Sequence, residues 1–195
     1  MSCQTRIKEQ NIPQLWDWLK QNDSQLFLEY QDQPEETCRK IRHQIRRINH
    51  LLDCEIIPGK DRHTLIVSPN NVHELFDDVR DIVSRAPQLK YWTITAFRPP
   101  RPLNDVENVK GIEYNIDDFR VAATKNPDGR VDLNIGVKNF DQYDYYKLLS
   151  AMFRILQKAL GEYNVEFRLG KVVLNPLDEK IHTIKLKNLI SVFQD

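Results

Sequence analysis

The sequence contains little cysteine and little glycine. Its 195 residues include three cysteines, Cys3, Cys38 and Cys54, and six glycines. An odd number of scattered cysteines argues against a disulfide framework or a paired-cysteine metal site, so we expect reduced thiols in a cytoplasm. The motifs GxGxxG and GxxxxGK[ST] are missing, so the sequence does not predict a glycine-rich phosphate-binding loop.

The sequence also lacks an excess of charge of either sign and lacks long apolar runs. Lys plus Arg and Asp plus Glu both number 28, so no net field attracts nucleic acid or an anionic membrane. No apolar run approaches the length of a membrane span, and residues 1–10 lack the apolar segment of a secretory signal. We therefore expect a soluble protein that does not associate with membranes.

Motifs of known catalytic chemistry are missing as well. There is no GxSxG nucleophile motif and no HExxH zinc motif, and neither Cys38 nor Cys54 has an identifiable local histidine partner that would lower the pKa of its thiol. Acidic residues cluster in the second half without the spacing of a calcium loop: Asp117, Asp118, Asp128, Asp132, Asp141 and Asp144. We predict no metal and no cofactor, and we favour a protein that is not an enzyme, although catalytic residues can also assemble from distant positions.

The most prominent stretch is YWTITAFRPPRP, residues 91–102. Its first seven residues alternate as a strand does, with Trp92 and Ile94 on one face. Pro99 and Pro100 cannot donate hydrogen bonds to a sheet, so the strand must end near Arg98.

The first half predicts helices followed by a β-β-α-β unit. We expect one or two short helices in 12–30 and an amphipathic helix over 35–52, where Ile41, Ile45, Ile48 and Leu52 share one side. Two short β-branched segments then flank a turn, an apolar helix starts after residue 68, and the strand over 91–97 closes the unit. The predicted strands and helix occupy residues 54–57, 63–67, 72–86 and 91–97.

The second half predicts the same order of elements. After a proline-rich connector over 99–110 and a short strand over 112–116, an Asp-Gly turn joins two alternating segments. Asp141 is the predicted cap of the following helix, and Gly161 stands where its C-terminal cap belongs. The predicted elements are strands 119–125, 130–138, 163–169 and 171–174, the helix 141–160 and a terminal helix 186–193.

We therefore predict an α+β fold with a mainly antiparallel sheet and helices packed on it. Two β-β-α-β units of similar length suggest a pseudo-repeat, although the same order can arise by coincidence, and the sequence leaves open whether the two units share one sheet or form two. We expect a single domain over 1–195, with halves at 35–98 and 111–175.

Two segments carry a resemblance to a known family. They are SPNNVHELFDDVRDIVSRAPQLKYWTITAFRPP and, much later, LGEYNVEFRLGKVVLNPL. Over roughly residues 35–180 the chain resembles an uncharacterised family of small bacterial cytosolic proteins. The resemblance implies a bacterial, cytosolic protein and brings no catalytic residue or substrate with it.

Three surfaces are candidates for binding. Arg98 and Arg101 beside rigid prolines predict an anion clamp, unless they pair with carboxylates nearby. Tyr143, Tyr145 and Tyr146 at a helix start are typical of an interaction surface, or of core packing with a hydroxyl in water. The basic helix face over Arg39–Arg47 offers a nucleic-acid surface, or simply a solvated one.

The function that we favour from the sequence is that of a cytoplasmic binding or protein-interaction protein. Its partner is another protein or a second copy of the chain, in contact with the tyrosines or the arginines. Two alternatives stay open. One is an enzyme acting on an anionic small molecule held by Arg98 and Arg101, and the other is a nucleic-acid-binding protein that uses the Arg39–Arg47 face.

Overall fold

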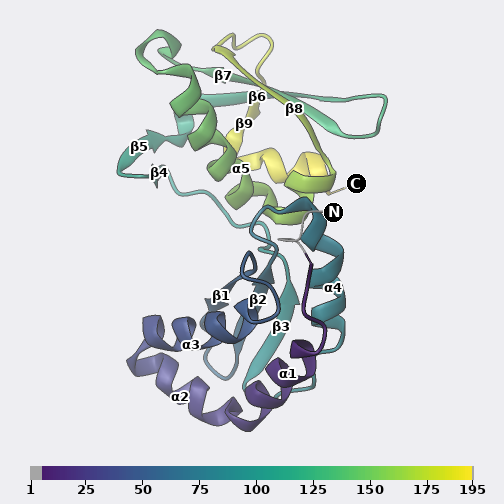
Figure 1. Cartoon of the computed structure of the whole chain (residues 1–195). Helices are drawn as coiled ribbons and strands as arrows, with labels where there is room; N and C mark the ends of the chain where they lie inside the picture. The colour runs from purple at the N-terminus through teal and green to yellow at the C-terminus, as the bar shows by residue number, and fades with distance from the viewer. Residues whose placement is uncertain (1–5, 195) are drawn as a thin grey trace. The chain divides into compact units, whose positions relative to one another are not determined.

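A computed structural model describes residues 6–194 and shows an α+β protein with three separate sheets (Figure 1). Its contacts divide the chain into two compact units, Met1–Arg98 and Pro99–Asp195. The boundary falls where the sequence predicted a proline-rich connector. Cys3 lies outside the described residues.

Three helices open the N-terminal unit: α1 (Asn11–Gln21), α2 (Asp23–Asp32) and α3 (Pro34–Arg46). Pro34 occupies the first turn of α3, where its missing N–H costs nothing. The predicted apolar stripe of α3 is buried, but the helix ends at Arg46 rather than at residue 52. Ile48 and Leu52 are buried from the turn that follows, so a helical spacing of apolar residues continued past the end of the helix.

A three-stranded sheet follows, in the order β1-β2-β3. The strands β1 (Asp53–Ile57) and β2 (His63–Ser68) form an antiparallel hairpin, as predicted. β3 (Trp92–Ala96) pairs parallel to β2. A parallel pair needs a crossover, which the short helix η1 (His73–Leu75) and α4 (Phe76–Ser84) provide.

The strand β3 leaves the sheet one residue after its end, before the prolines. Phe97 has a positive φ of 67°, and its N–H still donates to the Val67 carbonyl at 2.9 Å. Trp92 anchors the other end, because its buried indole N–H donates to the Asp23 carbonyl at 3.1 Å. The expected exit near Arg98 is therefore confirmed.

The C-terminal unit begins with a hairpin that the sequence prediction recognised only in part. It consists of β4 (Val106–Val109) and β5 (Ile112–Asn115), and β4 lies in the predicted connector. Lys110 and Gly111 both have positive φ, 53° and 83°, as a two-residue hairpin turn requires.

The main sheet of this unit has four strands in the order β8-β7-β6-β9. β6 (Phe119–Lys125) and β7 (Val131–Val137) form the predicted antiparallel hairpin, and β8 (Leu169–Pro176) is parallel to β7. β9 (Ile184–Lys185) is too short to be recognised from the sequence. The predicted terminal helix is the 3-10 helix η4 (Leu186–Phe193).

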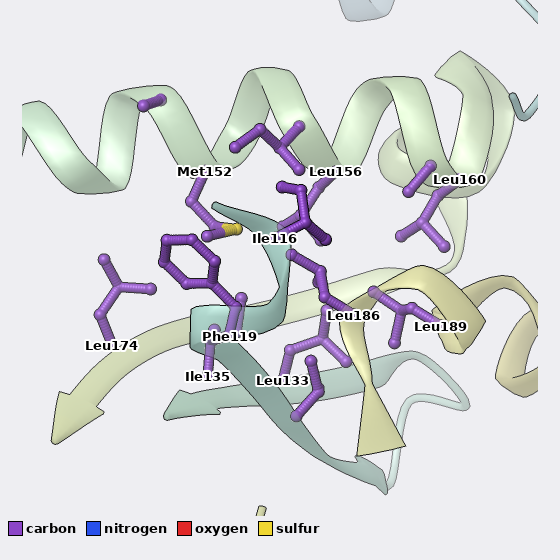
Figure 2. Close-up of a cluster of buried hydrophobic side chains, with 14 of the residues drawn as sticks. Ile116, Phe119, Leu133, Ile135, Met152, Leu156, Leu160, Leu174, Leu186 and Leu189 are labelled. Carbon is purple, nitrogen blue, oxygen red and sulfur yellow. The ribbon is translucent and has the colours of Figure 1, made fainter. Parts of the chain in front are cut away.

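The long helix α5 (Tyr145–Phe167) covers one face of this sheet. Figure 2 shows Met152, Leu156 and Leu160 of α5 directed toward Phe119, Leu133, Ile135 and Leu174 of the strands. Leu186 and Leu189 of η4 complete the same buried cluster.

Two details of α5 differ from the sequence prediction. Its cap is Asp144, whose carboxylate accepts from the Lys147 N–H at 2.9 Å, because Asp141 belongs to the preceding 3-10 helix η3 (Phe140–Gln142). Gly161 has the expected positive φ of 76°, but helical structure resumes after it. The strand predicted over 163–169 is therefore wrong, since β8 starts only at Leu169.

Each unit contains a β-β-α-β segment, β1-β2-α4-β3 or β6-β7-α5-β8, in which the first two strands pair antiparallel and the last two pair parallel. The strands of the two units belong to separate sheets, which answers the question of one sheet or two that the sequence left open. The pseudo-repeat itself is not confirmed. Within residues 6–194, no helix combines the length and apolar character needed to span a membrane.

The assignment of Asp144 as the N-terminal cap of α5 can be tested directly. Asp144→Ala should lower the free energy of unfolding by about 1 kcal/mol, because the Lys147 N–H loses its acceptor. Asp141→Ala is the matched control and should change it by less than about 0.5 kcal/mol. Urea unfolding measures both, and a larger loss for Asp141→Ala would contradict the assigned cap.

Candidate functional site

Arg98 lies just after β3 and is held by side chains of the neighbouring strands. Its guanidinium donates to an Asp53 carboxylate oxygen at 3.0 Å and to the Ser68 hydroxyl at 2.9 Å, and it approaches Glu55 at 3.3 Å. Pairing with carboxylates was the alternative to an anion clamp, and Arg98 shows that pairing. An anionic ligand would have to compete with Asp53 and Glu55.

Asp53 is the centre of this charged cluster. It also accepts from Arg42 at 2.7 Å, and Arg46 lies 3.9 Å away. Burial by itself would raise the pKa of Asp53, but the Arg42 hydrogen bond and the nearby positive charges outweigh it, so the pKa lies below its usual value. The cluster links α3 to the strands β1 and β3.

Arg101 belongs to the C-terminal unit and is half-buried. Its backbone N–H donates to the Lys158 carbonyl of α5 at 2.7 Å, which fixes the chain as it enters this unit. Arg98 and Arg101 therefore have different surroundings, and their joint role as a ligand clamp stays a prediction.

The basic face of α3 is largely neutralised by its own neighbours. Arg39 pairs with Glu36 at 2.6 Å and Lys40 with Glu29 at 2.8 Å, while Arg42 and Arg46 both contact Asp53. A hollow of about 370 Å³ lies beside these pairs, and Trp18 and His43 contribute to its wall. Phosphate binding along this face would have to displace carboxylates already in place.

His63 is buried in a group of aromatic rings in the N-terminal unit. Its ring centroid lies 4.5 Å from that of Phe27, 4.8 Å from Tyr30 and 5.3 Å from Trp92. The Gly59 N–H donates to its Nδ1 at 3.1 Å. Burial disfavours the charged imidazolium, so the pKa of His63 lies below its ordinary value of 6.5.

Cys38 and Cys54 are not activated for nucleophilic chemistry. Burial raises the pKa of the Cys54 thiol to about 12, and burial also raises the pKa of Cys38. Both thiols are protonated at neutral pH, whereas catalytic cysteines need the thiolate. In the part of the chain from residue 6 to residue 194, no group of three His, Cys, Asp or Glu side chains is placed to hold a metal ion.

The three candidate tyrosines lie at the start of α5 and differ in exposure. Tyr146 is 80% exposed and Tyr145 is 39% exposed, with their rings in edge contact at 5.6 Å. Tyr143 is half-buried and stacks on the buried Tyr114 of β5 at 6.4 Å. Tyr143 therefore packs on the buried side of this surface, and the ring of Tyr146 is exposed to solvent.

A hollow of about 410 Å³ lies between the β4–β5 hairpin and the first turns of α5, which are neighbours in Figure 1. We call it the hairpin–helix groove. Apolar side chains form most of its wall, and two lysines stand among them. The lining residues are Val109, Lys110, Ile112, Tyr114, Tyr146, Lys147, Ser150 and Ala151.

A smaller hollow of about 220 Å³ adjoins the groove and shares Val109 and Lys110 with it. We call it the basic hollow, because Arg154 and Lys158 of α5 also line it. Lys158 binds both carboxylate oxygens of Glu107, at 2.7 and 2.9 Å.

A third hollow in this unit, of about 620 Å³, has walls of mixed charge. Arg120 and Lys138 stand there with Asp117, Asp141 and Glu179. Lys138 is also 3.9 Å from Asp118. Such a mixture of charges favours no particular class of ligand.

The sequence prediction found the tyrosines but missed the other wall of the groove. The signal was available: Val106 to Val109 and Ile112 to Tyr114 flank Lys110-Gly111, a dipeptide suited to a tight hairpin turn. The prolines at 99, 100 and 102 led the whole stretch to be interpreted as a connector.

No protein-family model and no curated protein matches this chain. The resemblance to an uncharacterised bacterial family therefore stays a prediction.

The buried His63 predicts a pH dependence of stability. Its pKa is lower in the folded than in the unfolded chain, so its contribution to stability is complete above pH 6.5 and is lost as the pH falls below that value. Between pH 7.5 and 5, His63→Phe should reduce the fall in the free energy of unfolding, by at most about 1.4 kcal/mol per pH unit.

The exposed His50 provides the control. His50→Gln should leave the pH dependence of the free energy of unfolding close to that of the wild type. If His63→Phe retains the full wild-type pH dependence, then His63 is not the group responsible.

Proposed function

We propose that this chain is a non-enzymatic binding protein that holds a segment of a protein partner in the hairpin–helix groove. The observation that carries the proposal is the pairing of an exposed aromatic and an exposed aliphatic side chain around a concave surface. Tyr146 is 80% exposed and Ile112 is 48% exposed, and both line the groove. Covering such side chains removes apolar area from water, at about 25 cal/mol per Å².

The composition of the groove fits recognition rather than catalysis. Its wall combines a tyrosine, aliphatic side chains and a few polar groups, and it contains no carboxylate, histidine or cysteine. Tyrosine offers a large contact area at low cost in side-chain entropy, which is why it is common in interfaces. The cytoplasmic location and bacterial origin remain predictions from the sequence.

The two alternatives have less support from the geometry. An enzyme holding an anion at Arg98 and Arg101 would need Arg98 to exchange Asp53 and Glu55 for its substrate. A nucleic-acid surface on α3 would need its cations to exchange carboxylates for phosphates. The hairpin–helix groove needs no such exchange.

Selection from a displayed library of random twelve-residue peptides tests the proposal. Peptides selected on the wild-type chain should bind the double variant Ile112→Ser, Tyr146→Ser at least about tenfold more weakly, a loss of about 1.4 kcal/mol. Fluorescence anisotropy gives the affinities, and circular dichroism establishes that the variant is folded.

Leu28→Ser is the matched control, because Leu28 is 62% exposed on α2 in the N-terminal unit. It should leave peptide affinity unchanged. A library that yields no binding peptide, or peptides that bind the double variant as tightly as the wild type, would overturn the proposal.

A further inference from the structure

We infer that the partner segment is an acidic peptide, with an apolar side chain seated in the hairpin–helix groove and a carboxylate directed to the basic hollow. This inference rests on the proposed function and adds the chemistry of the partner.

The pleat of the hairpin decides which side chains face α5. Glu107 pairs with Tyr114 and Val109 with Ile112, so these four share one face. Glu107 and Tyr114 are 8% and 3% exposed, which places this face against α5. The other acidic residue of the hairpin, Glu113, therefore lies on the opposite face and adds no negative charge to the groove.

The helix supplies a row of cations along the same side. Lys147, Ala151, Arg154 and Lys158 follow one another at intervals of four, three and four residues, which forms one stripe of an α-helix. At 1.5 Å per residue this stripe is roughly 16 Å long. With Lys110 from the hairpin turn, four basic side chains line the two hollows.

Among the residues that line the two hollows, four are basic and one, Glu107, is acidic. Glu107 is bound by Lys158 and also accepts from the Asn104 N–H at 2.7 Å. Among residues 6–194, the side chains of Lys110, Lys147 and Arg154 form no ion pair, and Lys110 and Lys147 stand beside apolar wall. The groove therefore complements a ligand that is both apolar and negatively charged.

The distance between the hollows limits the spacing of the two groups in the ligand. Val109 and Lys110 line both hollows, so the hollows are adjacent. An extended peptide advances about 3.3 Å per residue. The carboxylate should therefore lie within about three residues of the apolar side chain.

Other occupants fit these charges less well. A second copy of the chain docked through the same surface on both molecules would bring the cations of one groove against those of the other. A small inorganic anion would leave Ile112 and Tyr146 uncovered. Single-stranded RNA would match the cations and Tyr146, but the aliphatic Val109 and Ile112 offer bases no stacking surface.

The test uses one peptide selected on the groove and its versions with acids changed to amides or to lysine. The acid-to-amide version should bind the wild type at least about tenfold more weakly. Lys147→Glu and Arg154→Glu should each weaken binding of the acidic peptide by a similar factor and strengthen binding of its lysine version. Lys125→Glu, at the end of β6, is the control and should change neither affinity.

The outcomes separate this inference from the proposed function. If the amide version binds as tightly as the acidic one while Ile112→Ser, Tyr146→Ser abolishes binding, the groove binds peptides and the acidic partner is wrong. Binding of poly(U) that Lys147→Glu removes, or a dimer that Tyr146→Ser dissociates in sedimentation, would each overturn the acidic peptide as the occupant. Loss of affinity on amide substitution, with rescue by charge reversal, supports it.

Discussion

The contact between Glu107 and Lys158 joins the β4–β5 hairpin to α5. Glu107 is almost fully buried and is satisfied by the Lys158 ammonium and by the Asn104 N–H. A buried carboxylate without these partners would be strongly unfavourable, so this pair fixes the hairpin to α5. The hairpin–helix groove exists because the hairpin is held there.

One side of α5 packs in the core, and another side lines the surface hollows. Leu148, Met152 and Leu156 are buried against the four-stranded sheet, whereas Lys147 and Arg154 are exposed on the side of the hairpin. Because the apolar stripe and the Lys158–Glu107 pair already hold the helix, Lys147 and Arg154 are not needed for this packing. Lys147 and Arg154 are therefore available to contact a partner.

Much of the fold followed from local patterns in the sequence. The Asn126-Pro-Asp-Gly turn, the apolar face of α5 and the exit of β3 were predictable because each depends on neighbouring residues. The β4 strand, the helical turns after Gly161 and the separation into three sheets were not, because they depend on which segments meet in space. For the site, the sequence identified Tyr146 but not Ile112, since only the hairpin brings Ile112 to the tyrosine.

The ion pairs of the two units differ in the number of cations that they hold. In the N-terminal unit, Asp53 pairs with Arg42, Arg46 and Arg98. The positive charges of these arginines therefore link the helix α3 to the sheet. In the hairpin–helix groove and the basic hollow, Glu107 satisfies only Lys158, and Lys110, Lys147 and Arg154 gain no such link within the described chain. Cations that stabilise nothing internally, placed beside exposed apolar side chains, favour a role in binding over a role in folding.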